Sequence, residues 1–298
     1  MEYRNLGNSH IKVSAIGFGC MSLGTDAQNA THLLQKAYDK GITIFDTADL
    51  YDHGQNEVIV GKALQHIRKN IVLCTKVGNV WNADKSGWQW NPTKAHIIRA
   101  VEQSLQRLQT DYIDLYQLHG GTIDDDTDDT IAAFEQLQQQ GKIRAYGISS
   151  IRPNVIRRYL DTSRISTVMM QYSLLDRRPE ESCLPLLAAN HKGLLVRGAI
   201  AQGLLAGKPA KPYLSYSGEK IAGFIEALKK IDANGKTSMQ LAVQYVLQHP
   251  ATGSVIAGIR TVEQLEQFTA ITELPPLSEM EYQQLQQLIE PLIYQEHR

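Results

Sequence analysis

The sequence predicts a closed (β/α)8 TIM barrel, and three observations carry this prediction. Eight short apolar runs typical of strands alternate with amphipathic segments typical of helices along the chain. Strands separated by helices pair in parallel, because each crossover helix packs on a face of the sheet. A chain of 298 residues with 43% hydrophobic side chains can fill one large barrel core. We therefore expect a single domain over residues 1–298.

The elements follow in a simple order. Two short strands around Gly7-Asn8-Ser9 predict a β-hairpin that caps the bottom of the barrel. The eight barrel strands are expected at residues 14–19, 43–46, 71–76, 112–119, 143–149, 166–173, 193–198 and 253–258. Helices connect them, two of them (218–232 and 237–248) before the last strand, and residues 277–290 predict an extra C-terminal helix outside the wall.

A doubly wound open sheet is the alternative arrangement of eight parallel strands. Such a sheet usually binds a dinucleotide through the pattern G-x-G-x-x-G after its first strand. Residues 17–24, GFGCMSLG, do not have that spacing. The barrel is therefore the better prediction.

Composition excludes several classes of function. Thirty basic and thirty-one acidic side chains give a net charge of −1, and no basic stripe predicts nucleic acid as a partner. The sequence shows neither a signal pattern nor an apolar run long enough for a membrane, so we expect a cytoplasmic protein. Cys20, Cys74 and Cys183 are odd in number and lie in apolar contexts, which favours buried free thiols over disulfides or a metal site.

Polar residues stand where the barrel strands end, which is the edge at which such barrels carry their active sites. They are Asp46, Lys76, His119, Ser149, Ser150, Gln171 and Arg197. Taken alone, each has an ordinary structural explanation, such as a helix cap, a surface cation or a packed histidine. Their common position at one mouth is what indicates a site.

Three of these side chains, those of Asp46, Lys76 and His119, form a chemically meaningful set together with Tyr51. Lys76 ends a buried run, where an unpaired ammonium is costly, and Asp46 on the preceding strand would relieve that cost. An ammonium beside a phenol favours the phenolate and lowers a phenol's pKa from its usual value of about 10. Tyr51 would thus become a proton donor, and His119 would orient or polarise a carbonyl oxygen.

The order of short motifs resembles the aldo-keto reductase family nearly from end to end. The matching segments are FDTADLYDHGQNE, IVLCTK, DYIDLYQLH, GKIRAYGISS, QYSLL, GLLAGK and AGIRTVEQLE. The resemblance implies NADPH-dependent reduction of an aldehyde or ketone, the small-molecule carbonyl substrate, to an alcohol. It implies Tyr51 as the general acid, Asp46 and Lys76 as the pair that tunes it, and His119 as the group that positions the carbonyl.

The same resemblance implies where NADPH or NADP+ would bind. Its nicotinamide end would contact Gly19, Cys20, Met21, Asp46, Ser149, Ser150, Gln171 and Arg197. A loop with Ile200, Gly203, Leu204 and Lys208 would cross the pyrophosphate. Gly258, Arg260, Thr261 and Gln264 would surround the 2′-phosphate, and Gln267 would reach the adenine.

Four positions depart from the family pattern. Arg197 replaces a frequent aromatic residue that stacks on the nicotinamide, and its positive charge would favour the reduced cofactor. Ser150 replaces a frequent asparagine, and Ala257 a frequent proline. Gln267-Phe268 replaces a glutamate-asparagine pair, which leaves adenine recognition to Gln267 and packing.

The substrate is less well defined by the sequence. Trp81, Trp88 and Trp90 lie in one long loop after the third strand and either line an apolar pocket or pack on the rim. The chain ends soon after its last helix, so we expect a broad, shallow site that no C-terminal segment closes. Residues 208–220 are the segment expected to clamp a cofactor.

Two other functions remain open at this point. A Schiff-base aldolase would use Lys76 as its nucleophile and would need neither Tyr51 nor Arg260. A regulatory or redox-sensing subunit of the same fold would bind NADPH without turnover, and catalytic activity separates it from a reductase.

Overall fold

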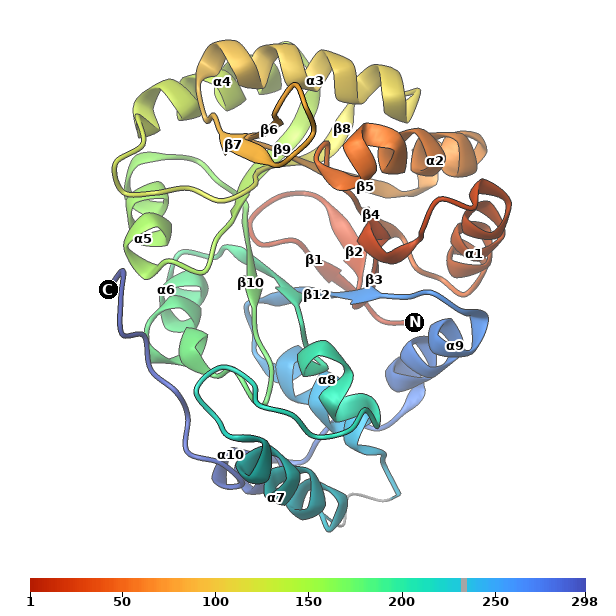
Figure 1. Ribbon diagram of the computed structural model, residues 1–298, viewed down its shortest axis with the longest axis vertical. Helices are drawn as coiled ribbons and strands as arrows, with labels where there is room; N and C mark the ends of the chain where they lie inside the picture. Colours follow the sequence, from red (N-terminus) through yellow and green to blue (C-terminus); the bar gives the residue numbers. More distant parts are fainter. Residues whose placement is uncertain (232–234) are drawn as a thin grey trace.

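Eight parallel strands close into a barrel in the computed structural model, which describes residues 1–231 and 235–298 (Figure 1). The strands are β3 (Ile16–Gly19), β4 (Ile44–Asp46), β5 (Val72–Val77), β8 (Ile113–Leu118), β9 (Ile143–Ser149), β10 (Thr167–Gln171), β11 (Gly193–Arg197) and β12 (Thr252–Gly258). They pair in this order, and β12 returns to β3. The predicted TIM barrel is confirmed, and each of the eight expected runs overlaps one barrel strand.

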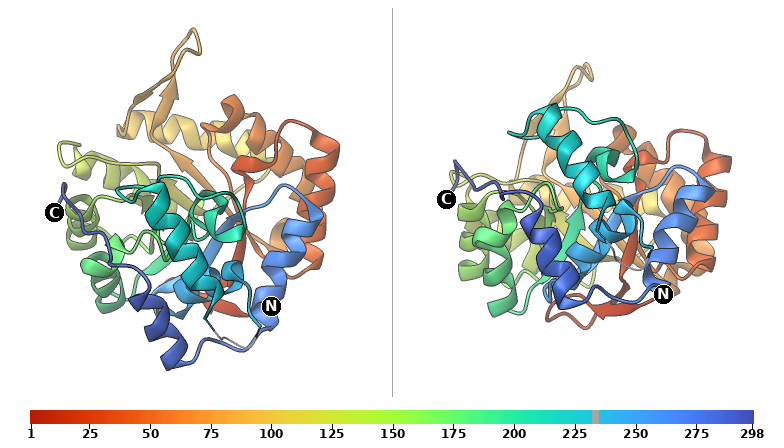
Figure 2. Two further views of the ribbon diagram at one scale, coloured as in Figure 1. Left: turned by 60° about the horizontal axis from the view of Figure 1, so that its bottom comes forward. Right: turned by 90° about the horizontal axis from the view of Figure 1, so that it is seen from below.

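Helices surround the barrel. They are α1 (Ala27–Asp39), α2 (Gln55–Leu64), α3 (Lys94–Leu108), α4 (Thr127–Gln139), α5 (Pro153–Thr162), α6 (Cys183–Ala189), α7 (Gly218–Lys229), α8 (Ser238–Gln248), α9 (Val262–Ala270) and α10 (Glu279–Gln287). Both α7 and α8 lie between β11 and β12, as expected, although residue 232, the expected end of the first, lies outside the described residues. The extra helix α10 packs on α8, where the rings of Tyr282 and Tyr245 stack with their centroids 4.7 Å apart (Figure 2).

Local sequence explains the boundaries of a typical wall helix. The hydroxyl of Thr93 caps the start of α3 by accepting a hydrogen bond from the backbone N–H of His96. The helix buries one apolar stripe and ends at Gln109, whose φ of 53° is left-handed. Neighbouring α2 approaches it at Gly61, where an added Cβ would lie 2.5 Å from the backbone oxygen of Leu108. This close helix–helix contact therefore requires glycine.

The bottom of the barrel is closed by a hairpin of β1 (Tyr3–Asn5) and β2 (Lys12–Ser14), which confirms the predicted cap. Its turn contains Gly7, which lies directly against the starts of the neighbouring barrel strands. An added Cβ at Gly7 would come within 2.3 Å of the backbone nitrogen of Gly193. Leu6 is fully buried and packs with the side chains that fill the barrel interior. The hairpin thus leaves the opposite end of the barrel as the open mouth.

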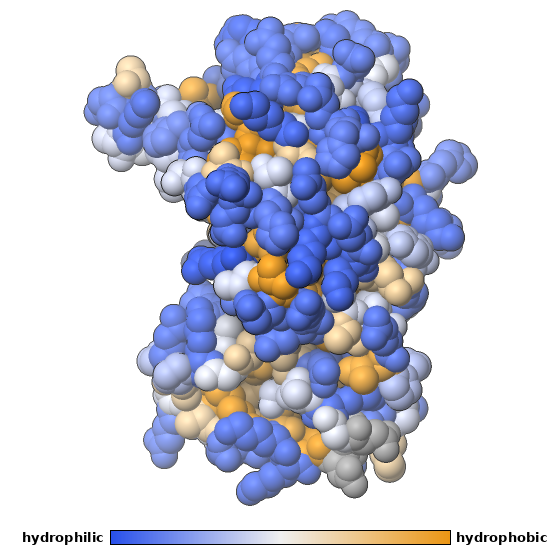
Figure 3. Space-filling view, turned by 90° about the vertical axis from the view of Figure 1, so that its right-hand side faces the viewer, coloured by the Kyte–Doolittle hydropathy of each residue, from blue (hydrophilic) through white to orange (hydrophobic). Residues whose placement is uncertain are grey.

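The face of the molecule shown in Figure 3 is mainly polar. On the side that carries α1 and α9, hydrophilic side chains predominate and apolar ones form small separate patches (Figure 3). Among the described residues, no helix is long and apolar enough to cross a membrane.

The loop with the three tryptophans folds as a second hairpin, of β6 (Asn79–Trp81) and β7 (Trp88–Trp90). The indole N–H of Trp90 donates to Asp125 (2.9 Å), and that of Trp81 donates to the carbonyl of Leu50 (3.0 Å). None of the three tryptophans lines the large cavity at the barrel mouth. The structure therefore favours packing on the rim.

The C-terminal segment corrects one expectation. Residues 290–297 cross the rim of the barrel mouth and line its cavity. The segment is held by main-chain and side-chain contacts: the backbone N–H of Asn154 donates to the carbonyl of His297 (2.8 Å), and that of Tyr294 donates to Glu181 (3.0 Å). The expectation that no C-terminal segment closes the site was wrong, because these contacts depend on tertiary placement and not on local pattern.

Candidate active site

Lys76 is the centre of the site at the barrel mouth. Its ammonium donates to Asp46 Oδ2 (2.6 Å), to the carbonyl of Thr47 (2.7 Å) and to the hydroxyl of Tyr51 (3.4 Å). The side chain is only 1% exposed, so no water competes freely for these donors. The predicted association of Asp46, Tyr51 and Lys76 is therefore present in the geometry.

Strand pairing explains why the carboxylate and the ammonium meet. Asp46 ends β4 and pairs in register with Cys74 on β5, so Lys76 lies two residues further along the neighbouring strand. Residues two apart on a strand point to the same side. The third partner, the carbonyl of Thr47, follows Asp46 directly and was not expected from the sequence.

A constrained turn carries Tyr51. Asp52 and His53 both have left-handed backbone conformations, with φ of 48° and 55°, and Gly54 follows with φ of 85°. Non-glycine residues adopt this region at a cost, which the surrounding contacts must offset. One of these contacts is the ring of Trp81, whose centroid lies 4.0 Å from that of His53. The turn thereby holds the phenol over Lys76.

His119 follows β8 and faces the phenol. The two rings meet edge to face with centroids 5.9 Å apart. Burial, together with the charges of Lys76 and Arg197, lowers the pKa of His119 to about 3. The imidazole is therefore neutral at physiological pH and can donate one hydrogen bond. Its buried Nδ1 has no protein partner among the described residues.

The buried ion pair sets the charges of the site. Burial raises the pKa of Asp46, and the ammonium of Lys76 and the amide of Gln117 oppose that effect. Burial lowers the pKa of Lys76, but the charges and hydrogen bonds of Asp46 and Tyr51 together outweigh burial, so the pKa of Lys76 is raised. Lys76 is consequently held as an ammonium that points one proton at the Tyr51 oxygen.

Gln117 is a member of the site that the sequence reasoning missed. It lies on β8, two residues before His119, and is fully buried. Its amide N–H donates to Asp46 Oδ1 at 3.3 Å, so it contacts the carboxylate oxygen that Lys76 leaves free. Only the register between β5 and β8 places it there, although its spacing from His119 is a signal that could have found it.

Replacing Gln117 by Leu is expected to move the acid limb of the pH–kcat profile to higher pH. The variant removes a hydrogen bond that favours ionised Asp46, whose pKa burial already raises, so Asp46 will take up its proton at a higher pH. The pH dependence of kcat in both proteins measures this shift.

Gln244 offers a matched control for the loss of a buried amide. It is 6% exposed, and its side chain donates to the carbonyl of Pro275 at 2.9 Å, away from Asp46. Gln244→Leu should lower stability without moving the acid limb. Equal profiles for Gln117→Leu and the wild type would show that Gln117 has only a structural role.

The residues expected at the nicotinamide end lie on neighbouring strand ends. The amide of Gln171 donates to Asp176 (2.8 Å) and to the hydroxyl of Tyr213 (3.2 Å), and it accepts from Arg197 (3.2 Å). Asp176 and Tyr213 thus fix this amide, and neither was expected from the sequence. On the next strands around the wall, Gly19 on β3 pairs with Gly258 on β12.

The residues expected to contact the cofactor differ in how far their side chains are exposed to a ligand. Met21 is 64% exposed, whereas Cys20 is fully buried, so only the main chain of Cys20 is open to a ligand. Ser149 lines the cavity, while the hydroxyl of Ser150 accepts the backbone N–H of Arg152 (3.2 Å).

The loop after β11 contains the expected pyrophosphate contacts. Ala201, Gln202 and Gly203 all have positive φ, which turns the chain sharply. The stem of Lys208 lies against Gly203, where an added Cβ would be 2.8 Å from its Cδ. Leu204 is buried and anchors the loop, and Ile200 is half-buried. This loop does not line the large cavity.

The expected 2′-phosphate contacts gather at the start of α9. The hydroxyl of Thr261 caps this helix by accepting the N–H of Gln264 (3.3 Å), and the Gln264 side chain accepts the N–H of Arg260 (2.8 Å). The side chain of Arg260 is exposed. Gln267 is exposed too, but Phe268 is only 3% exposed and belongs to the core. Of the Gln267-Phe268 pair, only Gln267 remains available to a ligand.

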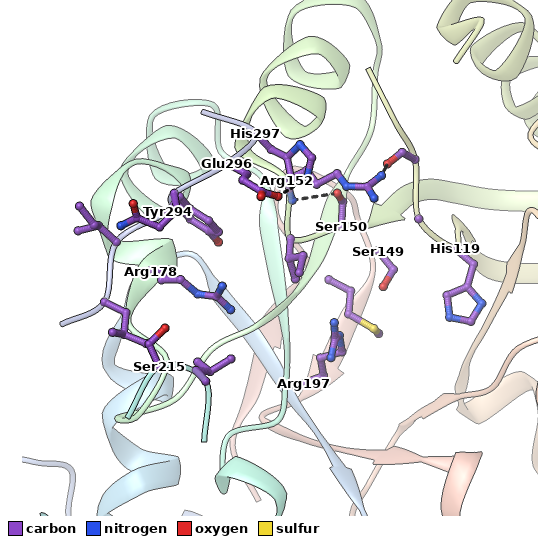
Figure 4. Close-up of a pocket in the computed structure, with 18 of the residues that line it drawn as sticks. His119, Ser149, Ser150, Arg152, Arg178, Arg197, Ser215, Tyr294, Glu296 and His297 are labelled. Atoms are coloured by element: carbon purple, nitrogen blue, oxygen red, sulfur yellow. Dashed lines mark hydrogen bonds and ion pairs between the residues drawn. The ribbon is translucent and has the colours of Figure 1, made fainter. Parts of the chain in front are cut away.

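One cavity of about 1110 Å³ joins the reacting groups to the rim of the barrel (Figure 4). Its lining includes Tyr51, Lys76 and His119, and further around the mouth Ser149 and Arg197. The neutral imidazole, the phenol and the ammonium converge on one side of this space. Such an arrangement can donate a proton to an oxygen atom that is also hydrogen-bonded by the imidazole.

Comparisons with known proteins agree with this architecture. The sequence model of the family described as "Aldo/keto reductase family" matches residues 15–290. The uncharacterized oxidoreductase YqkF of Bacillus subtilis is 48% identical over 307 aligned positions, which cover 100% of both chains. The holo form of aldo-keto reductase AKR11C1 from Bacillus halodurans superposes with a TM-score of 0.96 at 48% identity, covering 100% of this chain and 99% of that chain.

A third relative has a ligand named in its structure. The aldo/keto reductase from Klebsiella pneumoniae, solved in complex with NADP and acetate, has a TM-score of 0.78 and 28% identity. The superposition covers 96% of this chain and 95% of that one.

Proposed function

Since the chain belongs to the aldo/keto reductase family of oxidoreductases, we propose that it reduces aldehydes or ketones to alcohols with NADPH. The observation that carries this proposal is the contact of the Lys76 ammonium with both Asp46 and the Tyr51 hydroxyl. We also propose that residues 1–298 form one domain, which the family match over residues 15–290 supports.

The side chains of the site define the proton step. Tyr51 donates its phenolic proton to the carbonyl oxygen of the substrate, and Lys76 stabilises the phenolate that this leaves. His119, neutral at working pH, donates a hydrogen bond to the same oxygen and orients it. The nicotinamide of NADPH, when bound, supplies the hydride that reaches the carbonyl carbon.

The donor set at the mouth fits such a cofactor. Ser149 and Gln171 would bind the carboxamide, and Arg197 would stack on the ring in place of an aromatic side chain. The glycine-rich turn at Gly203 lets main-chain N–H groups approach a pyrophosphate, with Lys208 beside it. A relative solved with NADP supports the choice of cofactor class.

Arg260 tests the choice of NADPH over NADH. We propose that its exposed guanidinium and the start of α9 bind the 2′-phosphate, which NADH lacks. Arg260→Ala should weaken NADPH binding by about tenfold or more, since charge-assisted hydrogen bonds contribute about 1.5–3 kcal/mol. NADH binding should hardly change. Titrations of tryptophan fluorescence with both cofactors measure the two affinities.

The other two functions predict different results. An aldolase needs a deprotonated lysine, but Asp46 holds Lys76 as an ammonium and all three of its protons have acceptors. A regulatory subunit would bind NADPH without turnover. A panel of aldehydes and ketones assayed with NADPH and with NADH decides between a reductase and a subunit of this kind. Cofactor binding without oxidation of the cofactor by any carbonyl compound would contradict the reductase proposal.

A further inference from the structure

The cavity extends well beyond the groups that handle the proton. From Tyr51 and His119 it continues past Ser150 to Arg152 and to the C-terminal segment, residues 290–297 (Figure 4). Its volume of about 1110 Å³ is slightly above the range of about 300–1,000 Å³ that small-molecule sites occupy. A small aldehyde at Tyr51 would leave this outer part unfilled, so the outer part is where a substrate's other end would lie.

Arg152 is one of the charged groups that the fold holds in this outer part. It precedes α5, and its backbone N–H donates to Ser150 Oγ (3.2 Å). Its Nη1 donates to the carbonyl of Gly121, two residues after His119. Figure 4 shows the guanidinium between Ser150 and the loop that follows His119. One guanidinium edge is therefore anchored close to the reacting groups.

The opposite edge of this guanidinium, Nε with Nη2, has no protein partner among the described residues, and no carboxylate there lies within 4 Å of Arg152. Arg178, which lines the same cavity, provides the contrast. Both its Nε and its Nη2 are bonded to Asp176, at 2.7 and 2.8 Å. Three arginines therefore line the cavity. A carboxylate neutralises Arg178, and Arg197 donates to the uncharged amide of Gln171. Arg152 has neither kind of side-chain partner among the described residues.

The other charges around the outer cavity do not neutralise Arg152. Two glutamates line it, both from the C-terminal segment: the side chain of Glu296 is 83% exposed and lies 3.7 Å from His297, and Glu290 is exposed. Lys220 on α7 adds another cation, with its ammonium 5.1 Å from the centre of the Tyr216 ring. A partly buried guanidinium edge without a counter-charge favours an anionic ligand.

We propose that this protein prefers carbonyl substrates that carry a carboxylate at the end remote from the carbonyl, and that Arg152 binds this carboxylate. The free Nε–Nη2 edge matches the two oxygens of a carboxylate, which gives two parallel charge-assisted hydrogen bonds. The carbonyl would lie at Tyr51 and His119. The inference rests on the proposed reductase function and names its substrate class.

A matched pair of substrates tests this proposal: 4-carboxybenzaldehyde and its methyl ester, which share the ring and the aldehyde. We expect kcat/KM for the acid to exceed that for the ester by about tenfold or more in the wild type, because the ester cannot form charge-assisted bonds. Arg152→Gln should bring the ratio close to one. Arg152→Lys should give an intermediate ratio, since lysine keeps the charge but not the fork.

The test compares kcat/KM for the acid with kcat/KM for the ester in the same protein. A general loss of activity or folding lowers both values and leaves their ratio unchanged. Arg158 provides a control, because it lies on α5, the helix that Arg152 precedes, but its guanidinium donates to the carbonyl of Ile123 outside the cavity. Arg158→Gln should leave the ratio at its wild-type value. A ratio near or below one in the wild type, or an unchanged ratio in Arg152→Gln, would overturn the proposal.

Failure of the reductase proposal would look different. In that case neither aldehyde oxidises NADPH or NADH. Calorimetric binding of 4-(hydroxymethyl)benzoate and of its methyl ester, the two product alcohols, then tests Arg152 without turnover. Tighter binding of the acid that depends on Arg152 supports the carboxylate site, and equal binding of both alcohols refutes it.

Discussion

Replacing Tyr51 by Phe is expected to lower kcat by about 10²–10⁴-fold, the usual contribution of a positioned proton donor. The phenol is the group that donates the proton in our proposal, and the variant removes only its oxygen. Lys76 loses its weakest contact, at 3.4 Å, and keeps Asp46 and the Thr47 carbonyl. Cofactor binding and thermal stability should therefore change little. Steady-state kinetics, a fluorescence titration with NADPH and a melting curve provide the three measurements.

Tyr3 supplies the control for this experiment. Its hydroxyl donates to the carbonyl of Gly41 (3.1 Å) at the bottom of the barrel, the end opposite the site. Tyr3→Phe deletes a tyrosine hydroxyl with one hydrogen bond and should keep kcat at the wild-type level. If Tyr51→Phe kept most of the wild-type kcat, Tyr51 would not be the acid.

Replacing Lys76 by Met should have the largest effect on stability as well as on turnover. The variant leaves the buried carboxylate of Asp46 with Gln117 as its remaining side-chain donor, at 3.3 Å. Breaking one partner out of a buried ion pair costs about 3–5 kcal/mol in the free energy of unfolding. Chemical denaturation of the variant and the wild type measures this cost.

The loss of unfolding free energy in Lys76→Met should depend on pH, and its direction follows from the pKa of Asp46. Burial raises the pKa of Asp46, and without the ammonium nothing of opposite charge compensates for burial. The folded state then binds a proton more tightly than the unfolded state, so its stability falls as pH rises from the unfolded pKa to the folded pKa. The deficit should be smallest below the ordinary pKa of an aspartate and largest at neutral and higher pH.

The double variant Asp46→Asn with Lys76→Met distinguishes the stability cost of an unpaired buried charge from the loss of catalytic activity. It removes both charges, so it should recover most of the stability lost in Lys76→Met while remaining inactive. Lys229→Met, which removes an exposed partner of Glu226 on α7, should cost little. A single variant Lys76→Met as stable as the wild type would show that Asp46 carries no buried charge.

The architecture was largely predictable because its signals are local. Each barrel strand is a short apolar run, and each run could be recognised without knowing its neighbours. The bottom hairpin and α10 were predictable for the same reason. The pairing of Asp46 with Lys76 also followed from the sequence, since consecutive parallel strands of a barrel lie side by side and their ends meet at one mouth.

Other features depended on long-range placement. Gln117 contacts Asp46 across 71 residues of sequence, and Arg152 donates to Gly121 across 31. The bond between Asn154 and His297, which helps to dock the C-terminal segment, joins two main-chain groups and leaves no trace in the choice of side chains. The expectation that no C-terminal segment lies over the site was therefore wrong, although the association of Asp46, Tyr51 and Lys76 was predicted from the sequence.

The sequence by itself determined the barrel, its closing hairpin and the group of an acid, a phenol, an ammonium and an imidazole at one end. These features depend on the spacing of apolar residues and on the order of the strands, and both can be read directly from the sequence. The tertiary structure alone decided which charges remain unpaired, namely that Asp176 neutralises Arg178 while one edge of Arg152 stays free. Charge pairing depends on distances of a few ångströms, which the path of the backbone sets even for near neighbours such as Asp176 and Arg178.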